Sequence, residues 1–239
     1  MKRNICMIAH RGYSSKYFQN TELAFLKAAE HRSGGAETDI RVTKDNVLVC
    51  SHNKEAVFYD GSELIVEDAT FEELTQKPLR HSLNHGEVYI CTFKRYLEIM
   101  RDNNMICFIE LKGSFSDEKE KAVYDMINEV YRVDRCILQS FDFDNLIRMH
   151  NTYPDLPLMF TYGSSESGWE RCFDYNISLD ADQFVITDEM IKAFHGHGLE
   201  VGVWTANQKK DFERCRDLGV DYIESDVFGG ADLMSDFNA

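Results

Sequence analysis

The sequence predicts an α/β fold, and within that class a closed (β/α)8 barrel, the TIM-barrel architecture, with a small insertion after the second barrel strand. Two observations lead to this prediction. Short apolar or β-branched runs alternate with segments of helical period from one end of the chain to the other. The length of 239 residues also gives one strand and one helix for every ~30 residues. An open, doubly wound sheet is the main alternative.

Nine runs have the composition of strands, because they are short, rich in apolar residues and bounded by turn or helix signals. They cover residues 5–10, 36–42, 47–52, 105–112, 136–141, 158–162, 183–186, 201–205 and 222–225. The runs 36–42 and 47–52 lie close together, so we expect one of them to be a hairpin extension. Eight strands then remain for the barrel.

Helical period fills the intervals between these strands. The predicted helices cover residues 21–31, 93–103, 118–131, 143–151, 168–175, 188–195 and 209–218. Thr187 before Asp188 is a typical helix start, and Gly198 and Gly219 are typical helix stops.

A segment from about residue 53 to residue 91 interrupts the alternation of predicted strands and helices. This segment contains a turn signal at Asp60-Gly61 and a short helical run at 70–76. No low-complexity linker separates it from the rest of the chain. We therefore expect a single domain over residues 1–239, with this segment as an insertion.

Charge and composition exclude several classes of partner. The formal net charge is -15, with 41 acidic and 26 basic residues, so bulk electrostatics would repel nucleic acid and anionic membranes. No apolar run is long enough for a signal-peptide core or for a membrane span of ~20 residues. The seven cysteines are dispersed without C-x-x-C spacing, which indicates free thiols. We expect a cytoplasmic protein without stable membrane association, whose oligomeric state the sequence leaves open.

Ionisable residues end the predicted strands on the side where barrels bind their ligands. His10 and Arg11 close the first run. Glu37 and Asp39 are two positions apart, which places both carboxylates on one face of a strand. Glu110 and Lys112 repeat that spacing.

Three carboxylates that converge at a barrel mouth repel one another unless a cation neutralises them. An all-oxygen set suits one hard divalent cation, Mg2+ or Ca2+, better than zinc. Glu37, Asp39 and Glu110 are therefore candidate metal ligands. The simpler reading of Glu37 and Asp39 is an exposed strand face, but a carboxylate inside an apolar run, such as Glu110, is costly to bury without a partner.

Two histidines and two cations complete the candidate site. His10 and His52 each close an apolar run, and a histidine pair can divide proton removal and proton donation. Arg11 and Lys112 would give this acidic protein the local positive charge that a phosphate needs. The alternative for Lys112 is a structural salt bridge to Glu110. No glycine-rich phosphate loop occurs in the sequence.

With these residues in this order, the chain resembles the glycerophosphodiester phosphodiesterase family. The resemblance covers residues of about 8 to 228, and its motifs occur in the family's order. They are His10-Arg11-Gly12, Gln19-Asn20-Thr21 leading into a helix with Ala24-Phe25, Glu37-x-Asp39, His52 after a Val47-Leu48-Val49 strand, Glu110-x-Lys112, Gln139-Ser140-Phe141, Val203-Trp204-Thr205-Ala206-Asn207, and Gly219-Val220-Asp221-Tyr222-Ile223-x-Ser225-Asp226.

The resemblance implies metal-dependent hydrolysis of a small-molecule glycerophosphodiester to glycerol 3-phosphate and an alcohol, in a (β/α)8 barrel. It implies metal binding by the three carboxylates, acid–base catalysis by the two histidines and phosphate binding by Arg11 and Lys112. It also implies that Trp204 lines the pocket against the alcohol portion of the substrate, although core packing is the simpler reading for that residue. The sequence leaves open which histidine is the base and whether a cyclic phosphate forms.

Two positions depart from the family pattern. Gln19 stands where the family usually has Glu, and Asn53 follows His52 where the family usually has Asp. Neither change removes a candidate ligand or histidine, so we expect activity to be kept, with room for a different metal preference or substrate choice.

Three other functions use parts of the same residue set. One is phospholipase D-like cleavage of lysophospholipids, which would need an apolar groove formed by residues such as Phe58, Tyr59, Leu64 and Ile65. Another is a catalytically silent barrel that binds a phosphorylated ligand. The third is a metal-dependent lyase or isomerase acting on a sugar, which accounts less well for the paired Arg11 and Lys112.

Overall fold

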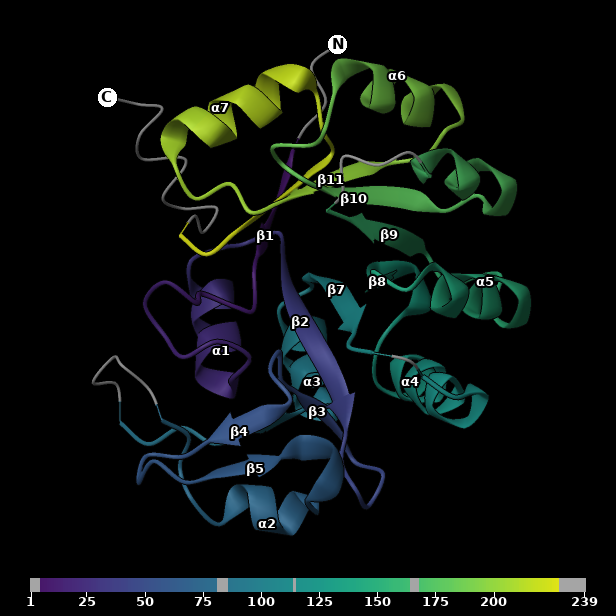
Figure 1. Ribbon diagram of the computed structural model, residues 1–239. Coiled ribbons are helices and arrows are strands. Elements are labelled where there is room, and N and C mark those ends of the chain that lie inside the picture. The colour runs from purple at the N-terminus through teal and green to yellow at the C-terminus, as the bar shows by residue number, and fades with distance from the viewer. Residues whose placement is uncertain (1–4, 81–85, 114, 164–167, 228–239) are drawn as a thin grey trace.

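The computed structural model describes residues 5–80, 86–113, 115–163 and 168–227, and its centre is a closed barrel of parallel strands (Figure 1). β1 pairs in parallel with both β12 and β2, which closes the ring and confirms the barrel prediction against the open sheet. The barrel strands are β1 (Cys6–Ala9), β2 (Gly35–Val42), β7 (Ile106–Leu111), β8 (Cys136–Ser140), β9 (Leu158–Tyr162), β10 (Ser178–Asp182), β11 (Val201–Trp204) and β12 (Tyr222–Ser225).

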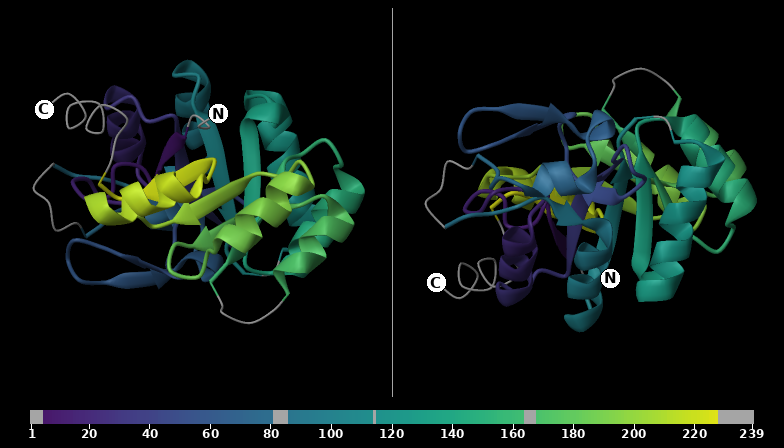
Figure 2. Two further views of the ribbon diagram at one scale, coloured as in Figure 1. Left: turned by 90° about the horizontal axis from the view of Figure 1, so that it is seen from above. Right: turned by 90° about the horizontal axis from the view of Figure 1, so that it is seen from below.

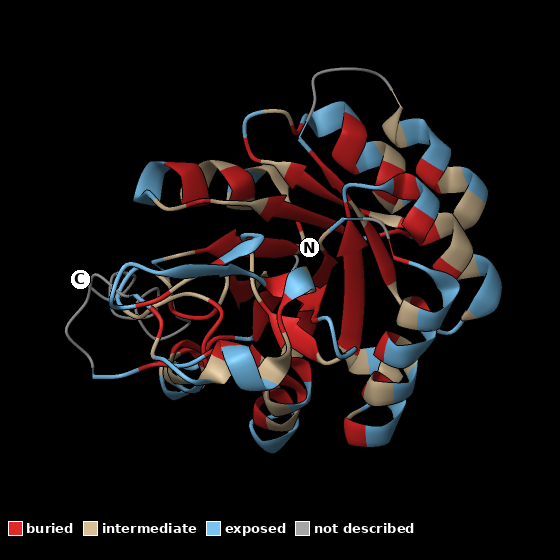
Figure 3. Cartoon of the chain, turned by 60° about the horizontal axis from the view of Figure 1, so that its bottom comes forward, coloured by how far each residue is buried: buried red, intermediate tan, exposed pale blue. Residues whose placement is uncertain are grey.

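Helices surround the barrel and bury one face each against it, as the red and blue sides of each helix show (Figure 3). Side chains accept the first free backbone N–H groups at several of their starts, for example Thr92 at α3 and Thr187 at α6. The outer elements are α1 (Glu22–Glu30), α3 (Phe93–Asp102), α4 (Asp117–Val130), the short 3-10 helix η2 (Val133–Arg135), α5 (Phe143–Thr152), the 3-10 helix η3 (Trp169–Tyr175), α6 (Asp188–Gly196) and α7 (Lys209–Leu218).

Strand periodicity divides the barrel interior into an apolar layer and a polar layer. Side chains two positions apart share a face of a strand. The apolar layer is a separate buried cluster made of Ile8, Phe108, Ile137, Met159 and Tyr222. Two positions further along the same five strands the inward residues are His10, Glu110, Gln139, Thr161 and Glu224. The apolar layer therefore forms the floor on which a polar site is built.

The predicted insertion lies beside the end of β2, toward which the β2 arrow points in Figure 1. β3 (Leu48–Cys50) runs antiparallel to β2 and confirms the hairpin extension, and β6 (Cys91–Thr92) pairs with β3. Between them lie β4 (Glu55–Val57), β5 (Glu63–Ile65), the 3-10 helix η1 (Val66–Asp68) and α2 (Phe71–Thr75). Seen from below, these elements lie along one side of the barrel (Figure 2, right). Residues 81–85 of the predicted insertion lie outside the described residues.

The insertion has its own small core. Phe58, Val66 and Leu74 are buried there with other apolar residues and with Val49 of β3. Phe58 is 1% exposed, so it does not line the apolar groove that lysophospholipid cleavage would need, whereas Tyr59 is 72% exposed. α2 confirms the short helical run predicted at 70–76. It starts with a capping box, in which the side chains of Thr70 and Glu73 each accept the backbone N–H of the other residue.

The predicted strand at 183–186 is wrong. The strand of this unit is β10, five residues earlier, and Gln183 follows it. The sequence Phe184-Val185-Ile186 is more apolar than Ser178–Asp182, so hydrophobicity alone selects the wrong segment. The polar composition of β10 has a physical reason, because Asp180 points into the polar layer of the barrel instead of the apolar one. A second prediction differs from the structure, because the helix expected at 168–175 is the 3-10 helix η3 and not an α-helix.

All seven cysteines are free thiols, and six of them are buried. Within the described ranges, no helix has both the length and the apolar character that crossing a bilayer requires.

Candidate active site

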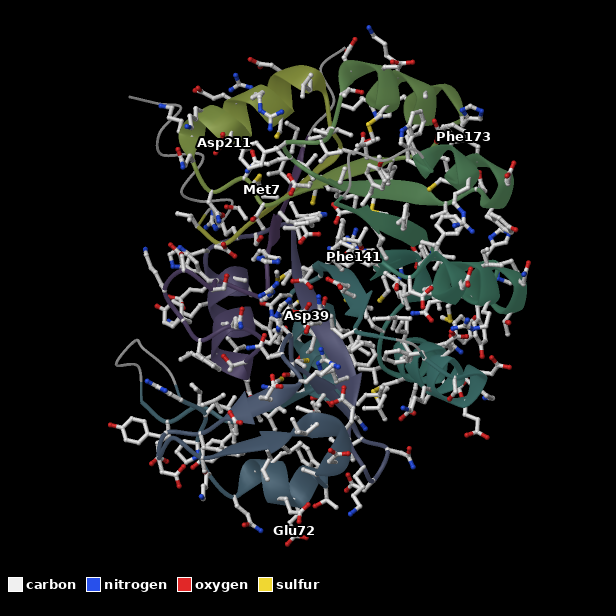
Figure 4. All side chains as sticks on the ribbon, viewed as in Figure 1. Met7, Asp39, Glu72, Phe141, Phe173 and Asp211 are labelled. Atoms are coloured by element: carbon white, nitrogen blue, oxygen red, sulfur yellow. The ribbon has the colours of Figure 1, made fainter. Side chains whose placement is uncertain are left out.

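Seven of the eight barrel strands, and the residue directly after the eighth, each supply a side chain to one pocket at the strands' carboxyl ends. The cavity volume of this pocket is about 120 Å3. It is lined by His10, which directly follows β1, and by Glu37, Glu110, Gln139, Thr161, Asp180, Trp204 and Glu224, together with Arg11, His52, Lys112 and Phe141. Seven of the eight predicted site residues are in this lining. The eighth, Asp39, is fully buried and contacts two of the lining residues, and Figure 4 shows it near the centre of the molecule.

Glu37, Asp39 and Glu110 are brought together as the sequence predicts. Each offers a carboxylate oxygen, and the three oxygens lie within 4.8 Å of one another. β2 and β7 set Asp39 directly opposite Glu110 in the sheet register. His10, Glu37 and Glu224 form a second group, whose possible ligand atoms also lie within 4.8 Å of one another.

The electrostatics of this cluster suit a bound cation. Burial raises the pKa of Glu37 well above its usual range, and the Asp39 and Glu224 charges raise it further. Burial, reinforced by the Asp39 charge, raises the pKa of Glu110 to about 7, although Lys112 opposes this. Among the described residues, the buried Oε1 of Glu37 has no hydrogen-bond partner. An unpaired carboxylate oxygen among other carboxylates is the donor set that a hard divalent cation satisfies.

The two candidate phosphate-binding cations are both paired with these carboxylates. Lys112 Nζ lies 2.6 Å from Glu110 Oε1 and 3.0 Å from Asp39 Oδ1. Arg11 Nε lies 3.2 Å from Asp39 Oδ2, and Arg11 Nη1 donates to Gln19 Oε1 at 2.9 Å. Burial acts to raise the pKa of Asp39, but Lys112 and Arg11 outweigh it and hold that pKa below its usual value. Both cations also line the pocket, so each can contact a ligand there.

The turn after β1 explains the sequence Arg11-Gly12. Gly12 has φ +77°, and a Cβ there would lie 2.7 Å from the backbone carbon of Ala24 in α1, so only glycine is accommodated. Arg11 has φ +57°, and its backbone N–H donates to Glu37 Oε2 at 2.8 Å. This tight turn points both the backbone and the side chain of Arg11 at the carboxylate cluster.

His10 is oriented by a carboxylate. Its Nδ1 lies 2.7 Å from Asp226 Oδ1, which leaves Nε2 on the pocket side, 4.0 Å from Glu37 Oε2. Ser14 and Asn207 also donate to the Asp226 carboxylate. Burial acts to raise the pKa of Asp226, but the hydrogen bond and charge of His10 and the other donors lower it to about 2. Asp226 is therefore an ionised partner for His10.

His52 is oriented by neutral groups. Its Nδ1 lies 2.8 Å from Asn53 Oδ1. The backbone carbonyl of His52 accepts from both Nε and Nη2 of Arg41, at 3.2 and 2.8 Å, and Arg41 Nη1 pairs with Glu67 of the insertion. Burial lowers the pKa of His52, while Asp39 and Asn53 oppose that effect. Arg41 thus fixes the segment that carries His52 to β2 and to the insertion.

Trp204 and Phe141 form the aromatic part of the lining. Their ring centroids are 5.7 Å apart at an angle of 76°, and Phe141 is 51% exposed. Trp204 Nε1 donates to the backbone oxygen of Asp180 at 3.3 Å. Trp204 therefore lies at the pocket wall and is only partly a core residue.

Three carboxylates of the site were given no role from the sequence. Asp180 and Glu224 are buried carboxylates that share Gln139 Nε2 as a donor, at 2.8 and 3.2 Å, and Asp226 is the partner of His10. Glu224 follows the apolar Tyr222-Ile223, so the argument that identifies Glu110 would have identified it too. Asp180 had no such signal, because its strand was placed five residues too late.

Comparison with known proteins identifies the family of this chain. The model of the glycerophosphoryl diester phosphodiesterase family matches residues 10–229. A glycerophosphodiester phosphodiesterase of Caldanaerobacter subterraneus is 30% identical over 230 residues, which cover 92% of this chain and 93% of that protein. Another from Bacillus altitudinis is 27% identical over 92% of this chain and 94% of that protein.

Solved structures share the fold. A phosphodiesterase from Oleispira antarctica, solved with its product sn-glycerol-3-phosphate, has a TM-score of 0.86 at 19% identity and covers 98% of this chain and 97% of that one. A glycerophosphodiester phosphodiesterase from Thermotoga maritima has a TM-score of 0.75 at 25% identity and covers 99% of this chain and 100% of that one. The family model matches nearly the whole barrel, and a relative is 30% identical over 92% of this chain. This chain therefore belongs to the glycerophosphoryl diester phosphodiesterase family.

Proposed function

We propose that the chain hydrolyses small glycerophosphodiesters to glycerol 3-phosphate and an alcohol, with one divalent cation, Mg2+ or Ca2+, and a pair of histidines. The observation that supports this most is the pocket itself, where two histidines and two cations surround a buried carboxylate cluster. The activity named for the relatives from Caldanaerobacter subterraneus and Bacillus altitudinis supports the same substrate class.

Glu37, Asp39 and Glu110 would hold the cation, with the group of His10, Glu37 and Glu224 as the neighbouring alternative. A divalent cation bound there supplies polarisation of the phosphoryl oxygens and offsets the charge that grows in the transition state. It would also offset part of the excess negative charge, because among the described residues of the site five carboxylates (Glu37, Asp39, Glu110, Asp180 and Glu224) face the two cations Arg11 and Lys112.

Arg11 and Lys112 would bind the phosphate. Arg11 presents a planar fork and Lys112 a point charge, and together they hold the phosphoryl group against the carboxylates. Trp204 and Phe141 would cover an organic part of the substrate with their ring faces and edges.

We assign the base role to His10 and the acid role to His52. The ionised Asp226 at Nδ1 stabilises the imidazolium that forms when His10 Nε2 accepts a proton. His52 has only the neutral Asn53 at Nδ1, and Arg11 and Lys112 lower its pKa further after the effect of burial. Its protonated form is therefore the more ready proton donor of the two.

The proton and bond balance is the same for either nucleophile. An oxygen of water, or of the substrate's glycerol, forms a bond to phosphorus and gives its proton to His10. The bond from phosphorus to the alcohol oxygen breaks, and His52 gives that oxygen a proton. When glycerol attacks, a cyclic phosphate results, and water opens it in a second step with the two histidine roles exchanged.

The test is release of glycerol 3-phosphate from a panel of glycerophosphodiesters by chelator-treated protein resupplied with Mg2+ or Ca2+ separately. Turnover restored by one of the metals is expected. A lysophospholipid arm runs in parallel, and turnover confined to it would replace this proposal with the phospholipase D-like function. Binding of the diesters without turnover under any condition would replace it with the silent binding barrel.

The role of Asp226 can be tested separately. Replacing Asp226 by Asn is expected to lower kcat by about 10- to 1,000-fold with little change in KM, because the amide no longer stabilises the imidazolium of His10. The matched control is Ser14→Ala, which removes a second hydrogen bond to the same carboxylate but leaves the His10 pair in place. Steady-state kinetics with equal losses in both variants would contradict the assigned role.

A further inference from the structure

A second pocket adjoins the active site. Its cavity volume is about 70 Å3, and it lies between the turn before α1, the end of β3 and the insertion. His52 lines both pockets. Gln19, which accepts from Arg11 Nη1, and Asn53, which contacts His52 Nδ1, also line the second one. The two pockets therefore meet at His52 and at the side chains that contact Arg11.

The lining of this second pocket has a definite chemistry. Its walls are mainly apolar and include Phe18, Val57, Leu79 and Ile90. Glu55 is its one carboxylate, and its lining contains no Lys or Arg. Within the described part of the chain, Glu55 has neither an ion pair nor a side-chain hydrogen bond. Glu55 is solvent-exposed and still lines the pocket. Its negative charge beside apolar walls favours a small group with methylene or methyl carbons and a positive charge over an anionic one.

A phosphodiester has two organic arms on opposite sides of phosphorus. With the phosphate at Arg11 and Lys112, Trp204 and Phe141 can cover one arm. Because His52 lines both pockets, an arm on the other side of phosphorus that runs past His52 would reach the second pocket. This direction agrees with the acid role of His52, because the group that protonates the departing oxygen must lie beside the arm that departs.

We propose that the second pocket is a subsite for the departing alcohol and selects amino alcohols, such as ethanolamine or choline, through Glu55. The inference rests on the proposed function and adds its alcohol specificity. It gives the aromatic wall of Trp204 to the glycerol arm instead of the alcohol portion that the family resemblance suggests. The insertion then contributes directly to substrate choice, because β4 supplies Glu55 and Val57.

The test compares two substrates that differ only in the departing arm. sn-Glycero-3-phosphoethanolamine has a cationic arm, and glycerophosphoglycerol has a neutral one. For the unmodified chain we expect kcat/KM to favour the ethanolamine diester by about 5- to 10-fold, and Glu55→Gln to bring that ratio close to one. Glu55→Lys should reverse the preference. The control is Glu63→Gln, a carboxylate on β5 that does not line the pocket.

Calorimetric binding of the same two diesters to the Ca2+-supplied protein separates this inference from the proposed function. A binding preference for the ethanolamine diester that Glu55→Gln abolishes supports the subsite even if no diester is hydrolysed. An equal change for both substrates in Glu55→Gln, an unchanged ratio, or the same shift in Glu63→Gln would overturn the subsite while leaving hydrolysis itself intact.

Discussion

Replacing either pocket histidine by alanine is expected to lower kcat by about 100- to 10,000-fold, the range for loss of a general acid or base. His10→Ala removes the proton acceptor that Asp226 orients, and His52→Ala removes the donor beside the departing oxygen. Neither side chain belongs to the buried core, so both variants are expected to fold. Steady-state kinetics with a glycerophosphodiester at saturating metal measure the loss.

A matched control and a second substrate make this prediction specific. His195→Ala removes another His–Asp pair, in which Nε2 lies 2.9 Å from Asp221 Oδ2, from a position outside the pocket lining. That variant should keep its activity. A diester with a p-nitrophenol arm has a leaving group that needs no proton, so its hydrolysis should largely recover in His52→Ala but not in His10→Ala. The reverse pattern would exchange the two roles, and full activity in either alanine variant would remove the histidine mechanism.

Much of this site could be predicted from the sequence because its ionisable residues lie in or next to apolar strand sequences. Glu110 in an apolar strand is costly to bury alone, and such a residue indicates a partner. His10 and Arg11 end a buried strand in the same way. The period of two residues in each strand then predicts that these side chains share one face, and the barrel brings the faces together.

The parts that could not be predicted depend on contacts between distant segments. Asp226 is 216 residues from His10, and no local pattern links the two. Asp180 lies in a strand too polar to be recognised by hydrophobicity, because its inward side faces the carboxylate layer instead of an apolar one. Phe58 is apolar and so could line a groove, but the fold of the insertion buries it. In each case the three-dimensional neighbour decides the role.

The carboxylate cluster leads to a second large effect, on stability. In metal-free protein, Glu37→Gln is expected to raise the free energy of unfolding by on the order of 1–3 kcal/mol, because the amide removes a buried charge that Asp39 and Glu224 repel. The same variant should lose its response to metal. For the unmodified chain, Mg2+ or Ca2+ at about 100 times Kd should raise that free energy by about 2.7 kcal/mol. Thermal unfolding with and without each metal measures both effects.

Asp180→Asn is the control for this trade between stability and binding. Asp180 is also buried with a raised pKa, yet it lies outside both groups of candidate ligands. Its replacement should stabilise the metal-free protein and keep the response to metal. If Glu37→Gln kept that response, or if Asp180→Asn lost it, the proposed ligand set would be wrong.

The same cluster predicts how the stability of metal-free protein depends on pH. The pKa of Glu110 is raised to about 7 in the folded chain, against an ordinary value of 4.5. Between these values the folded chain binds a proton that the unfolded chain has lost, so the free energy of unfolding falls as pH rises from about 4.5 to about 7. A bound divalent cation favours the ionised carboxylate and should remove this fall. Denaturant unfolding of metal-free protein at a series of pH values, repeated with Ca2+, would refute the cluster as a cation site if the two profiles had the same slope.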